Sequence, residues 1–365
     1  MISRLSVSFA RCLRRVSWIP VLLAAFGLSG TIPIRPAAGD PAWGRLITSA
    51  AIAGNPSTHR IYAVNEGANS VKVIDAAAGT THIVPVGSEP IALAVNRLTN
   101  RIYVANNGSG SVSVIDGRND TVIATVVCDR LPYTLAVNES TNKVYVTHTY
   151  TGTVTAIDGA TNTSQSLRVG DADGVAIDPR TNAIFLTTYE DSNIRIVDGA
   201  TGAVTRVAVG AHIWGMLFDE PSGTLYLGHT GTAEVVALNE KTNAVSRIPV
   251  GKIPCALAID PVMRRLYAVN YGDETVSVID LSAGNAIATL PVGKHPQAVT
   301  IDPKSHRVYV ANVLGDDVTV IDGTKNAVIG ASSAGVHPYG VAVDSASGLV
   351  FAANYGAPWV TPVRN

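Results

Sequence analysis

Residues 101–106 read RIYVAN, and close variants of this string recur along the chain at a nearly constant spacing. The copies begin at Arg60, Arg101, Lys143, Ala183, Thr224, Arg265, Arg307 and Leu349 and read RIYAVN, RIYVAN, KVYVTH, AIFLTT, TLYLGH, RLYAVN, RVYVAN and LVFAAN. Tyrosine or phenylalanine occupies the third position of every copy, and the gaps between successive aromatic residues are 41, 42, 40, 41, 41, 42 and 42 residues. A period of about 41 residues held through seven intervals predicts an array of identical supersecondary units.

Each unit is predicted to contain four short strands, which we name a, b, c and d in chain order. In the second unit they cover residues 91–95, 101–106, 111–115 and 121–127. Every run is rich in β-branched residues and is bounded by Gly, Asn, Asp or Pro. The short turn between each pair of strands requires antiparallel pairing, which argues against a solenoid of parallel strands.

A single four-stranded sheet cannot bury both of its faces, whereas a ring of such sheets can. The sequence therefore predicts an all-β fold, a β-propeller of four-stranded antiparallel blades. Strand a carries small residues such as Ala92 and Ala94, so we place it nearest the axis, where space is least. Eight blades are favoured, and seven blades with an overhanging partial unit are the alternative.

The last unit ends after its third strand, so the eighth blade would need a fourth strand from the N-terminal side of the domain. Trp43 to Ile47 is the candidate segment, although it matches the d-strand pattern poorly. Pro362 falls inside the last c strand, where it removes a hydrogen-bond donor. The predicted closure therefore joins three strands from the C-terminus to one from the N-terminus.

The first 39 residues differ from the rest of the chain. They carry five arginines and no acid, an apolar run from Trp18 to Leu28, and the small residues Ala37-Ala38-Gly39. This layout predicts a signal peptide over residues 1–39 and a single propeller domain over residues 40–365. A cut near Gly30 and an uncleaved anchor are the alternatives. We expect an exported protein, periplasmic or extracellular and at the cell surface, with no transmembrane span after signal removal.

The charge of the mature chain disfavours nucleic acid as a partner. The whole chain has 27 basic and 28 acidic residues; removing five arginines leaves 22 against 28, a net charge of about −6. Binding to phosphate backbones usually needs a basic face. Cys12 lies in the signal region, and Cys128 and Cys255 fall on different strands of distant units, so we expect free thiols rather than a disulfide.

The repeated strings also carry a resemblance to a known family. YVAN, YAVN and YVTH in strand b, with SVSVIDG from Ser111 and TVSVID from Thr275, resemble the YVTN β-propeller repeat family over Ala50 to Asn354. The resemblance implies a bacterial or archaeal propeller that is exported or displayed at the surface. It implies no particular activity, although related propellers also occur as subunits of periplasmic redox enzymes.

The antiparallel order places the d–a and b–c turns at one rim of the ring, the channel mouth, and the a–b and c–d turns at the other. Ligands of propellers usually lie at the first rim, by analogy of fold. Units 3 to 5 depart from the repeat there, and two later histidines share the slot of His212. The candidate ligand-binding residues are His148, Asp173, Tyr189, Glu190, His212, Trp214, His229, His295, His337 and Tyr339.

These departures have a functional and a structural interpretation. Imidazoles, carboxylates and aromatic rims suit a cationic ligand, a sugar or a peptide. No cofactor is predicted, and a divalent metal is the one that these residue types could hold, assembled across blades. The structural interpretation, which we favour, is ordinary variation of loops. The aspartates Asp75, Asp116, Asp158, Asp198, Asp280 and Asp322 repeat at the c–d turns and are interpreted as turn formers.

No P-loop, GxGxxG, GxSxG or HExxH signature occurs in the chain. The sequence therefore favours a non-catalytic exported scaffold that binds a small ligand, a peptide or an envelope polymer or protein through the channel mouth. The alternative is a periplasmic enzyme or redox-enzyme subunit of the metal-assisted lyase or lactonase type, with its site at the same rim.

Overall fold

The computed structural model describes residues 51–356 and 359–363. The predicted signal peptide and the candidate strand from Trp43 to Ile47 lie outside the described residues. Within the described part every regular element is a strand, apart from one short 3-10 turn, η2 (Glu66–Ala68).

The strands form eight sheets in chain order, one for each repeat unit. The first four sheets contain β1 (Ile52–Asn55), β2 (Arg60–Asn65), β3 (Ser70–Asp75) and β4 (Thr80–Pro85); β5 (Pro90–Asn96), β6 (Arg101–Asn106), β7 (Ser111–Asp116) and β8 (Thr121–Val127); β9 (Pro132–Asn138), β10 (Lys143–His148), β11 (Thr153–Asp158) and β12 (Ser164–Arg168); and β13 (Gly174–Asp178), β14 (Ala183–Thr187), β15 (Asn193–Asp198) and β16 (Val204–Ala208).

The remaining sheets complete the series, and the last has three described strands. They contain β17 (Ile213–Asp219), β18 (Thr224–His229), β19 (Glu234–Asn239) and β20 (Val245–Pro249); β21 (Pro254–Asp260), β22 (Arg265–Asn270), β23 (Thr275–Asp280) and β24 (Asn285–Pro291); β25 (Pro296–Asp302), β26 (Arg307–Asn312), β27 (Asp317–Asp322) and β28 (Ala327–Ser333); and β29 (Pro338–Asp344), β30 (Leu349–Asn354) and β31 (Val360–Val363).

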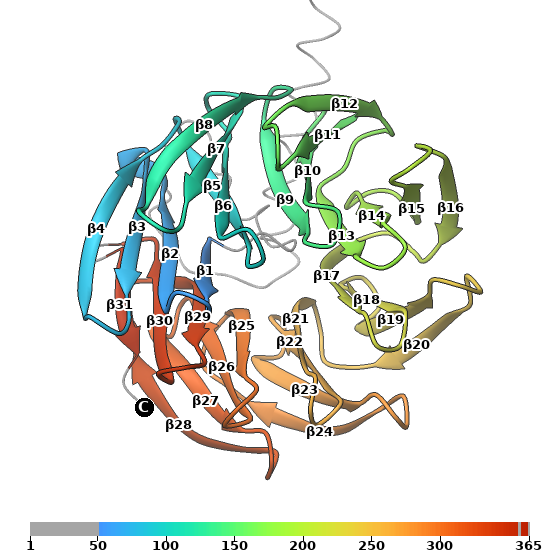
Figure 1. Cartoon of the computed structure of the whole chain (residues 1–365). Coiled ribbons are helices and arrows are strands. Elements are labelled where there is room, and N and C mark those ends of the chain that lie inside the picture. The colour runs from blue at the N-terminus through green and yellow to red at the C-terminus, as the bar shows by residue number, and fades with distance from the viewer. Residues whose placement is uncertain (1–50, 357–358, 364–365) are drawn as a thin grey trace, which may run out of the picture. The chain divides into compact units, whose positions relative to one another are not determined.

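The eight sheets stand in a closed ring, which confirms the predicted β-propeller and excludes seven blades (Figure 1). Each a strand contacts the a strands of both neighbouring units, and β29 contacts β1, so the a strands surround the axis as predicted. Strands b and d of the second unit have the predicted bounds. Strand a runs from Pro90 to Asn96 and is irregular between Pro90 and Ala92; proline has no N–H to donate to the ladder.

Aromatic residues of strand b pack between neighbouring blades. Tyr62, Tyr103 and Phe185 are completely buried. Tyr62 shares one apolar cluster with Ile102 of the next unit, and Phe185 stacks on Phe218 of the next unit with ring centroids 5.2 Å apart. The repeating aromatic is therefore an inter-blade core residue, as its periodicity predicts.

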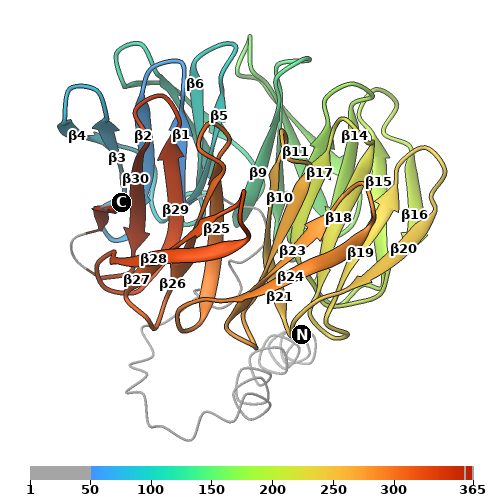
Figure 2. The ribbon, with the colours of Figure 1, turned by 90° about the horizontal axis from the view of Figure 1, so that it is seen from below.

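Backbone contacts confirm which turns share a rim (Figure 2). At the mouth rim, the b–c turn is bonded to the d–a turn, as where the N–H of Tyr271 donates to the carbonyl of Ile253 at 3.0 Å. At the opposite rim, the c–d turn is bonded to the a–b turn, as where the N–H of Gly323 donates to the carbonyl of His306 at 2.9 Å. The repeating aspartates close the c–d turns: Asp280 accepts the N–H of Ser282 at 2.7 Å.

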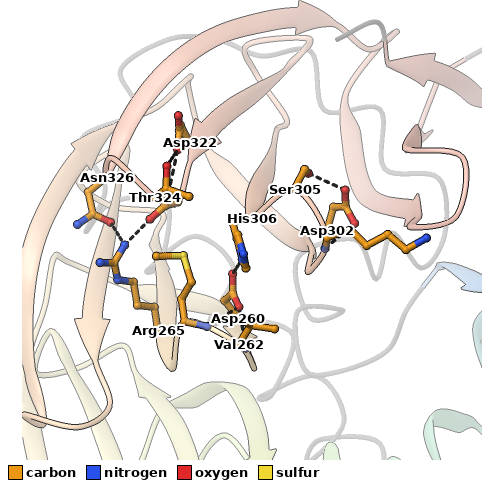
Figure 3. A network of polar contacts seen from close by, with 12 residues as sticks. Asp260, Val262, Arg265, Asp302, Ser305, His306, Asp322, Thr324 and Asn326 are labelled. Carbon is orange, nitrogen blue, oxygen red and sulfur yellow. Dashed lines mark hydrogen bonds and ion pairs between the residues drawn. The ribbon is translucent and has the colours of Figure 1, made fainter.

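A polar ladder at the opposite rim joins neighbouring units (Figure 3). The last residue of strand a meets the residue before strand b of the following unit. The pairs include Asn55 with Asn100 at 2.6 Å, Asn96 with Asn142 at 2.9 Å, Asn138 with Asn182 at 2.8 Å, Asp219 with Arg264 at 2.6 Å and Asp260 with His306 at 2.8 Å. The ladder recurs around the ring, so its residues belong to the frame of the propeller.

Candidate functional site

A hydrogen-bonded pair recurs at the mouth rim and holds the d–a turn in place. It joins the last residue of strand b to a hydroxyl residue of strand c, and we call it the latch. In the second unit, the amide NH2 of Asn106 donates to the hydroxyl of Ser113 at 3.0 Å, and the N–H of Gly87 donates to the same hydroxyl at 3.4 Å. A Cβ on Gly87 would lie 2.7 Å from the Asn106 carboxamide, so only glycine fits there. Asn270 with Ser277 and Asn312 with Thr319 repeat the arrangement.

His148 occupies the latch position of the third unit. Its Nδ1 lies 3.2 Å from the Arg130 carbonyl, which can only accept, so Nδ1 carries the proton. Its Nε2 then accepts from the hydroxyl of Thr155 at 2.8 Å. The side chain is completely buried, and burial lowers its pKa. The structure therefore places His148 beneath the rim surface, with both ring nitrogens bonded to the protein.

The fourth unit replaces the latch pair by Thr188 and Arg195. The buried guanidinium of Arg195 donates to the carbonyls of Val169 (2.9 Å) and Asp171 and to the Thr188 hydroxyl at 2.8 Å. Its Nε is buried without a partner. Burial lowers the pKa of Arg195, because the charged form loses its hydration.

His229 takes the latch position of the fifth unit. The hydroxyl of Thr232 lies 3.1 Å from its Nδ1, and a Cβ on Gly210, whose φ is +98°, would lie 2.4 Å from its Nε2. Burial and then the positive charge of Arg247 lower the pKa of His229, which favours a neutral ring. Strand c offers Val236 in place of the usual hydroxyl, so the His229 ring turns to the b–c turn instead.

An aromatic cluster lies between units 4 and 5 at the mouth rim. The Tyr189 ring lies 4.9 Å from the His212 ring and 5.9 Å from the Trp214 ring, centroid to centroid. The N–H of His212 donates to the carbonyl of Tyr189 at 2.7 Å, and Tyr189 N–H donates to the carboxylate of Asp173 at 3.1 Å. Burial raises the pKa of Asp173 and of Tyr189. Glu190, next along the turn, is exposed.

Further pairs lie elsewhere on the rim. The ring of His295 stacks on Tyr271 of the preceding unit with centroids 4.7 Å apart, and burial lowers the pKa of His295. His337 lies with its Nδ1 3.0 Å from the carboxylate of Asp316. Tyr339 stacks on Tyr355 at 4.1 Å.

The structure brings together part of the predicted set. Asp173, Tyr189, His212 and Trp214 form the cluster just described, which we call the units 4–5 cluster. His229 lies beside it: a Cβ on Gly231 would lie 3.2 Å from the His212 ring and 3.4 Å from the His229 ring. The stacked pairs of His295 and Tyr339 and the His337–Asp316 pair are formed by residues outside that cluster.

Sequence reasoning missed Tyr271, Tyr355 and Arg195. Tyr271 and Tyr355 directly follow strand b, and the same slot holds Thr149 in the third unit, so the slot is variable. An alignment of the units at that slot would have found both tyrosines. Arg195 replaces a hydroxyl residue of strand c, and the same alignment would have shown it.

The described residues contain no group of three or more His, Cys, Asp or Glu residues placed to hold one metal ion. In residues 51–356 and 359–363, no helix is long and apolar enough to cross a membrane. Cys128 and Cys255 are free, as expected, and burial raises the pKa of each thiol to about 12.

Comparison with known proteins shows the fold and no closer family. No protein-family model and no curated protein matches the chain. Among solved structures, hydrazine synthase from Kuenenia stuttgartiensis is similar, with a TM-score of 0.63 and 19% identity over 80% of this chain and 99% of that one. The dihydro-heme d1 dehydrogenase NirN in complex with DHE is also similar, with a TM-score of 0.70 and 16% identity over 84% of this chain and 71% of that one. This chain is an eight-bladed β-propeller.

Proposed function

We propose that this propeller is an exported, non-catalytic scaffold that binds a ligand or envelope polymer at its mouth rim. The observation that carries the proposal is the units 4–5 cluster. It offers the faces of Tyr189 and Trp214 beside the His212 imidazole and the Asp173 carboxyl, contributed by two blades. Aromatic faces pack against the C–H faces of sugars and against peptide side chains, while imidazole and carboxyl groups give hydrogen bonds.

The experiment is a binding screen on the purified mature protein with three probes: a peptidoglycan oligosaccharide, a proline-rich peptide and a quaternary amine. Binding is followed by calorimetry and by tryptophan fluorescence. We expect saturable binding of one probe that weakens at least about tenfold in Y189A and W214A, as loss of an aromatic anchor does. Y150A is the matched control, because Tyr150 is 70% exposed at the b–c turn of unit 3. Binding unaffected by Y189A and W214A, or no binding of any probe, would reject the proposal.

A catalytic role is the second candidate, because shifted titrating groups gather at the same place. The pKa of Asp173 is raised by burial, and the pKa values of Arg195 and His229 are lowered by burial. Such clusters mark functional sites more often than chance. The two similar structures are a hydrazine synthase and a dihydro-heme d1 dehydrogenase.

The dependence of the melting temperature on divalent metal ions distinguishes the binding scaffold from a metal-assisted enzyme. Thermal unfolding is measured with divalent ions and after EDTA. A metal-assisted enzyme should lose several degrees on chelation, because a bound ion stabilises the folded state by mass action. The melting temperature of the scaffold should not change. Export is tested separately by N-terminal sequencing of the protein recovered from the periplasm and the medium, with a start near Asp40 expected.

A further inference from the structure

A cleft of about 290 Å³ opens between units 5 and 6, and its residues belong to neither the mouth rim nor the ladder. It lies among the b, c and d strands of unit 5 and the c–d turn of unit 6. Tyr226, Ile248 and Leu281 supply apolar surface, and Thr224, Asn239 and Ser246 supply polar groups. No residue that lines the cleft carries a charge.

The first cause of the cleft is an exception in inter-blade packing. In most units where strand b carries tyrosine, the next unit starts its c–d turn with glycine. At Gly159 and Gly323, the tyrosine hydroxyl is one of the atoms that lie where a side chain would begin. A Cβ on Gly159 would lie 2.6 Å from the Tyr103 hydroxyl, and one on Gly323 would lie 2.6 Å from the Tyr267 hydroxyl. Where strand b carries phenylalanine, the slot holds a larger residue: Glu240 follows Phe185, and Ala76 follows Phe351.

Tyr226 breaks this relation, because it faces Leu281 rather than glycine. Among the steps whose two partners are both described, no other tyrosine faces a side chain at this slot. The hydroxyl and the leucine cannot share the space that a tyrosine and a glycine share elsewhere. Tyr226 and Leu281 instead share one apolar cluster across the two units, and both line the cleft.

The second cause is that a side-chain bridge found between some other units is absent between units 5 and 6. This bridge runs from an arginine at the start of strand b to the c–d turn of the next unit. Arg60 donates to the carbonyl of Gly117 at 2.8 Å and lies 2.8 Å from the carboxylate of Asp120. Arg265 donates likewise to the carbonyl of Gly323 and to the side chain of Asn326 at 3.0 Å (Figure 3).

At the step from unit 5 to unit 6 both ends of this bridge are missing. Thr224 stands in the arginine slot, and Gly284 stands in the slot of Asp120 and Asn326. The space that an arginine side chain fills between units 1 and 2 and between units 6 and 7 is thus left open. Three independent positions, Thr224, Leu281 and Gly284, change together at a single step and leave an uncharged hollow.

We propose that this cleft is a binding site for a small uncharged molecule, with one substituted ring or two fused rings and one or two hydroxyl groups. The cleft is open to solvent beside Val245 and Ser246, and its volume is larger than the cavity of about 150 Å³ that accepts benzene, so a substituted ring fits by size. Tyr226, Ile248 and Leu281 receive the ring. Thr224 and Ser246 bond its hydroxyl groups, as does Asn239, whose carboxamide oxygen is already bonded to Thr242 and leaves its NH2 as donor.

The uncharged lining sets the selectivity. A carboxylate or ammonium group in the cleft would lose part of its hydration and find no opposite charge among the lining residues, which is costly. Neutral probes should therefore bind, and their charged counterparts of similar shape should not. The probes are p-cresol and 2-phenylethanol, compared with 4-hydroxybenzoate and tyramine.

The decisive variant restores the bridge. T224R/G284N recreates the Arg265–Asn326 pair and fills the cleft. Asparagine suits this position, because φ is +68° at Gly284 and +50° at Asn326. The matched control is L349R/G79N, which makes the same change at the step from unit 8 to unit 1, where Leu349 is 43% exposed and φ of Gly79 is +67°.

Binding is measured by calorimetry and by saturation-transfer NMR on the folded protein, with circular dichroism of each variant. We expect saturable binding of the neutral probes, loss of at least about tenfold in affinity in T224R/G284N, and unchanged affinity in L349R/G79N. The absence of saturable binding, equal binding of the charged probes, or equal affinity in T224R/G284N would overturn the proposal.

Discussion

His59 of the first unit lies 3.4 Å from the carboxylate of Asp344 of the last unit, so the ladder that joins neighbouring blades also spans the two ends of the ring. The Asp344 side chain is 1% exposed. Apolar packing accompanies the contact, because Ile52 and Ile61 of the first unit share a cluster with Phe351 of the last. Among the described residues the last blade has three strands, and these contacts hold it against the first blade.

We predict that D344A lowers the free energy of unfolding by about 2 kcal/mol, because it removes a buried carboxylate that accepts the N–H groups of Ala346 and Ser347. H59A should cost less than about 1 kcal/mol, because His59 is 42% exposed. Urea unfolding measures both. Asp302 has the same slot one unit earlier and bonds Ser305 of its own turn, as Asp344 bonds Ser347. It differs in that the following unit has Gly348 in the slot of His59. If D344A did not increase proteolysis of the last unit relative to D302A, the seam contact would have no special role.

Acid should weaken the same seam. Burial alone would raise the pKa of Asp344, but hydrogen bonds from Ser347 and the turn N–H groups outweigh it and lower the pKa. A lowered pKa in the folded state stabilises the protein fully above the unfolded value of about 4. That stabilisation is lost as pH falls through the folded value. The unfolding midpoint of D344N should therefore depend less on pH below about 4 than that of the parent protein.

The fold was predictable from the sequence because the repeat is dense in local signals. The aromatic of RIYVAN recurs in every unit and marks strand b, and Asp-Gly after strand c marks the turn in units 2, 3, 4 and 7. The candidate site was predictable only in part. His148 differs from the repeating asparagine, yet it makes the same kind of buried bond. The ring of Tyr271 stacks on His295 of the next unit. A single sequence does not show which side chains of neighbouring units touch, so this contact could not be predicted.

His148 gives a second prediction. H148N should be within about 1 kcal/mol of the parent protein, because asparagine fills this position in other units, whereas H148A should cost about 2 kcal/mol. Burial lowers the pKa of His148, so its neutral form stabilises the folded protein above the unfolded value of about 6.5, and this is lost as pH falls below it. The difference in melting temperature between parent and H148N should grow in favour of H148N from pH 8 to pH 5. A constant difference would mean that His148 does not titrate on unfolding.

The Thr188–Arg195 pair gives a third prediction. R195S should destabilise the protein by about 2–3 kcal/mol, because the carbonyls of Val169 and Asp171 lose a buried donor. T188N/R195S restores the asparagine–serine pair seen in Asn106 and Ser113 and should recover about 1–2 kcal/mol of that loss. A double-mutant cycle by urea unfolding measures the coupling. If the changes in the free energy of unfolding caused by T188N and R195S were additive, the two positions would not be energetically coupled.

The two thiols should be unreactive in the folded protein. Burial raises the pKa of Cys128 and Cys255 to about 12, so almost no thiolate exists at neutral pH. In a C12S variant, a disulfide-exchange reagent at pH 8 should label neither thiol of the native protein within minutes and both after unfolding in urea. Rapid labelling of Cys255, which is completely buried, would indicate that its blade opens locally. Labelling of Cys128 alone would indicate exposure at the d–a turn only.

The pairing of tyrosine with glycine between blades can be tested directly at Gly323. G323A would bring a Cβ to 2.6 Å from the Tyr267 hydroxyl and 2.5 Å from the His306 carbonyl, so it should destabilise the protein by about 1–3 kcal/mol. G330A is the control, because a Cβ there meets no atom within 4 Å. Y267F should recover part of the loss in G323A, since it removes one of the two close atoms, while the carbonyl remains. If G323A and G330A unfolded at the same urea concentration, the Tyr267 hydroxyl would not exclude a side chain at this slot.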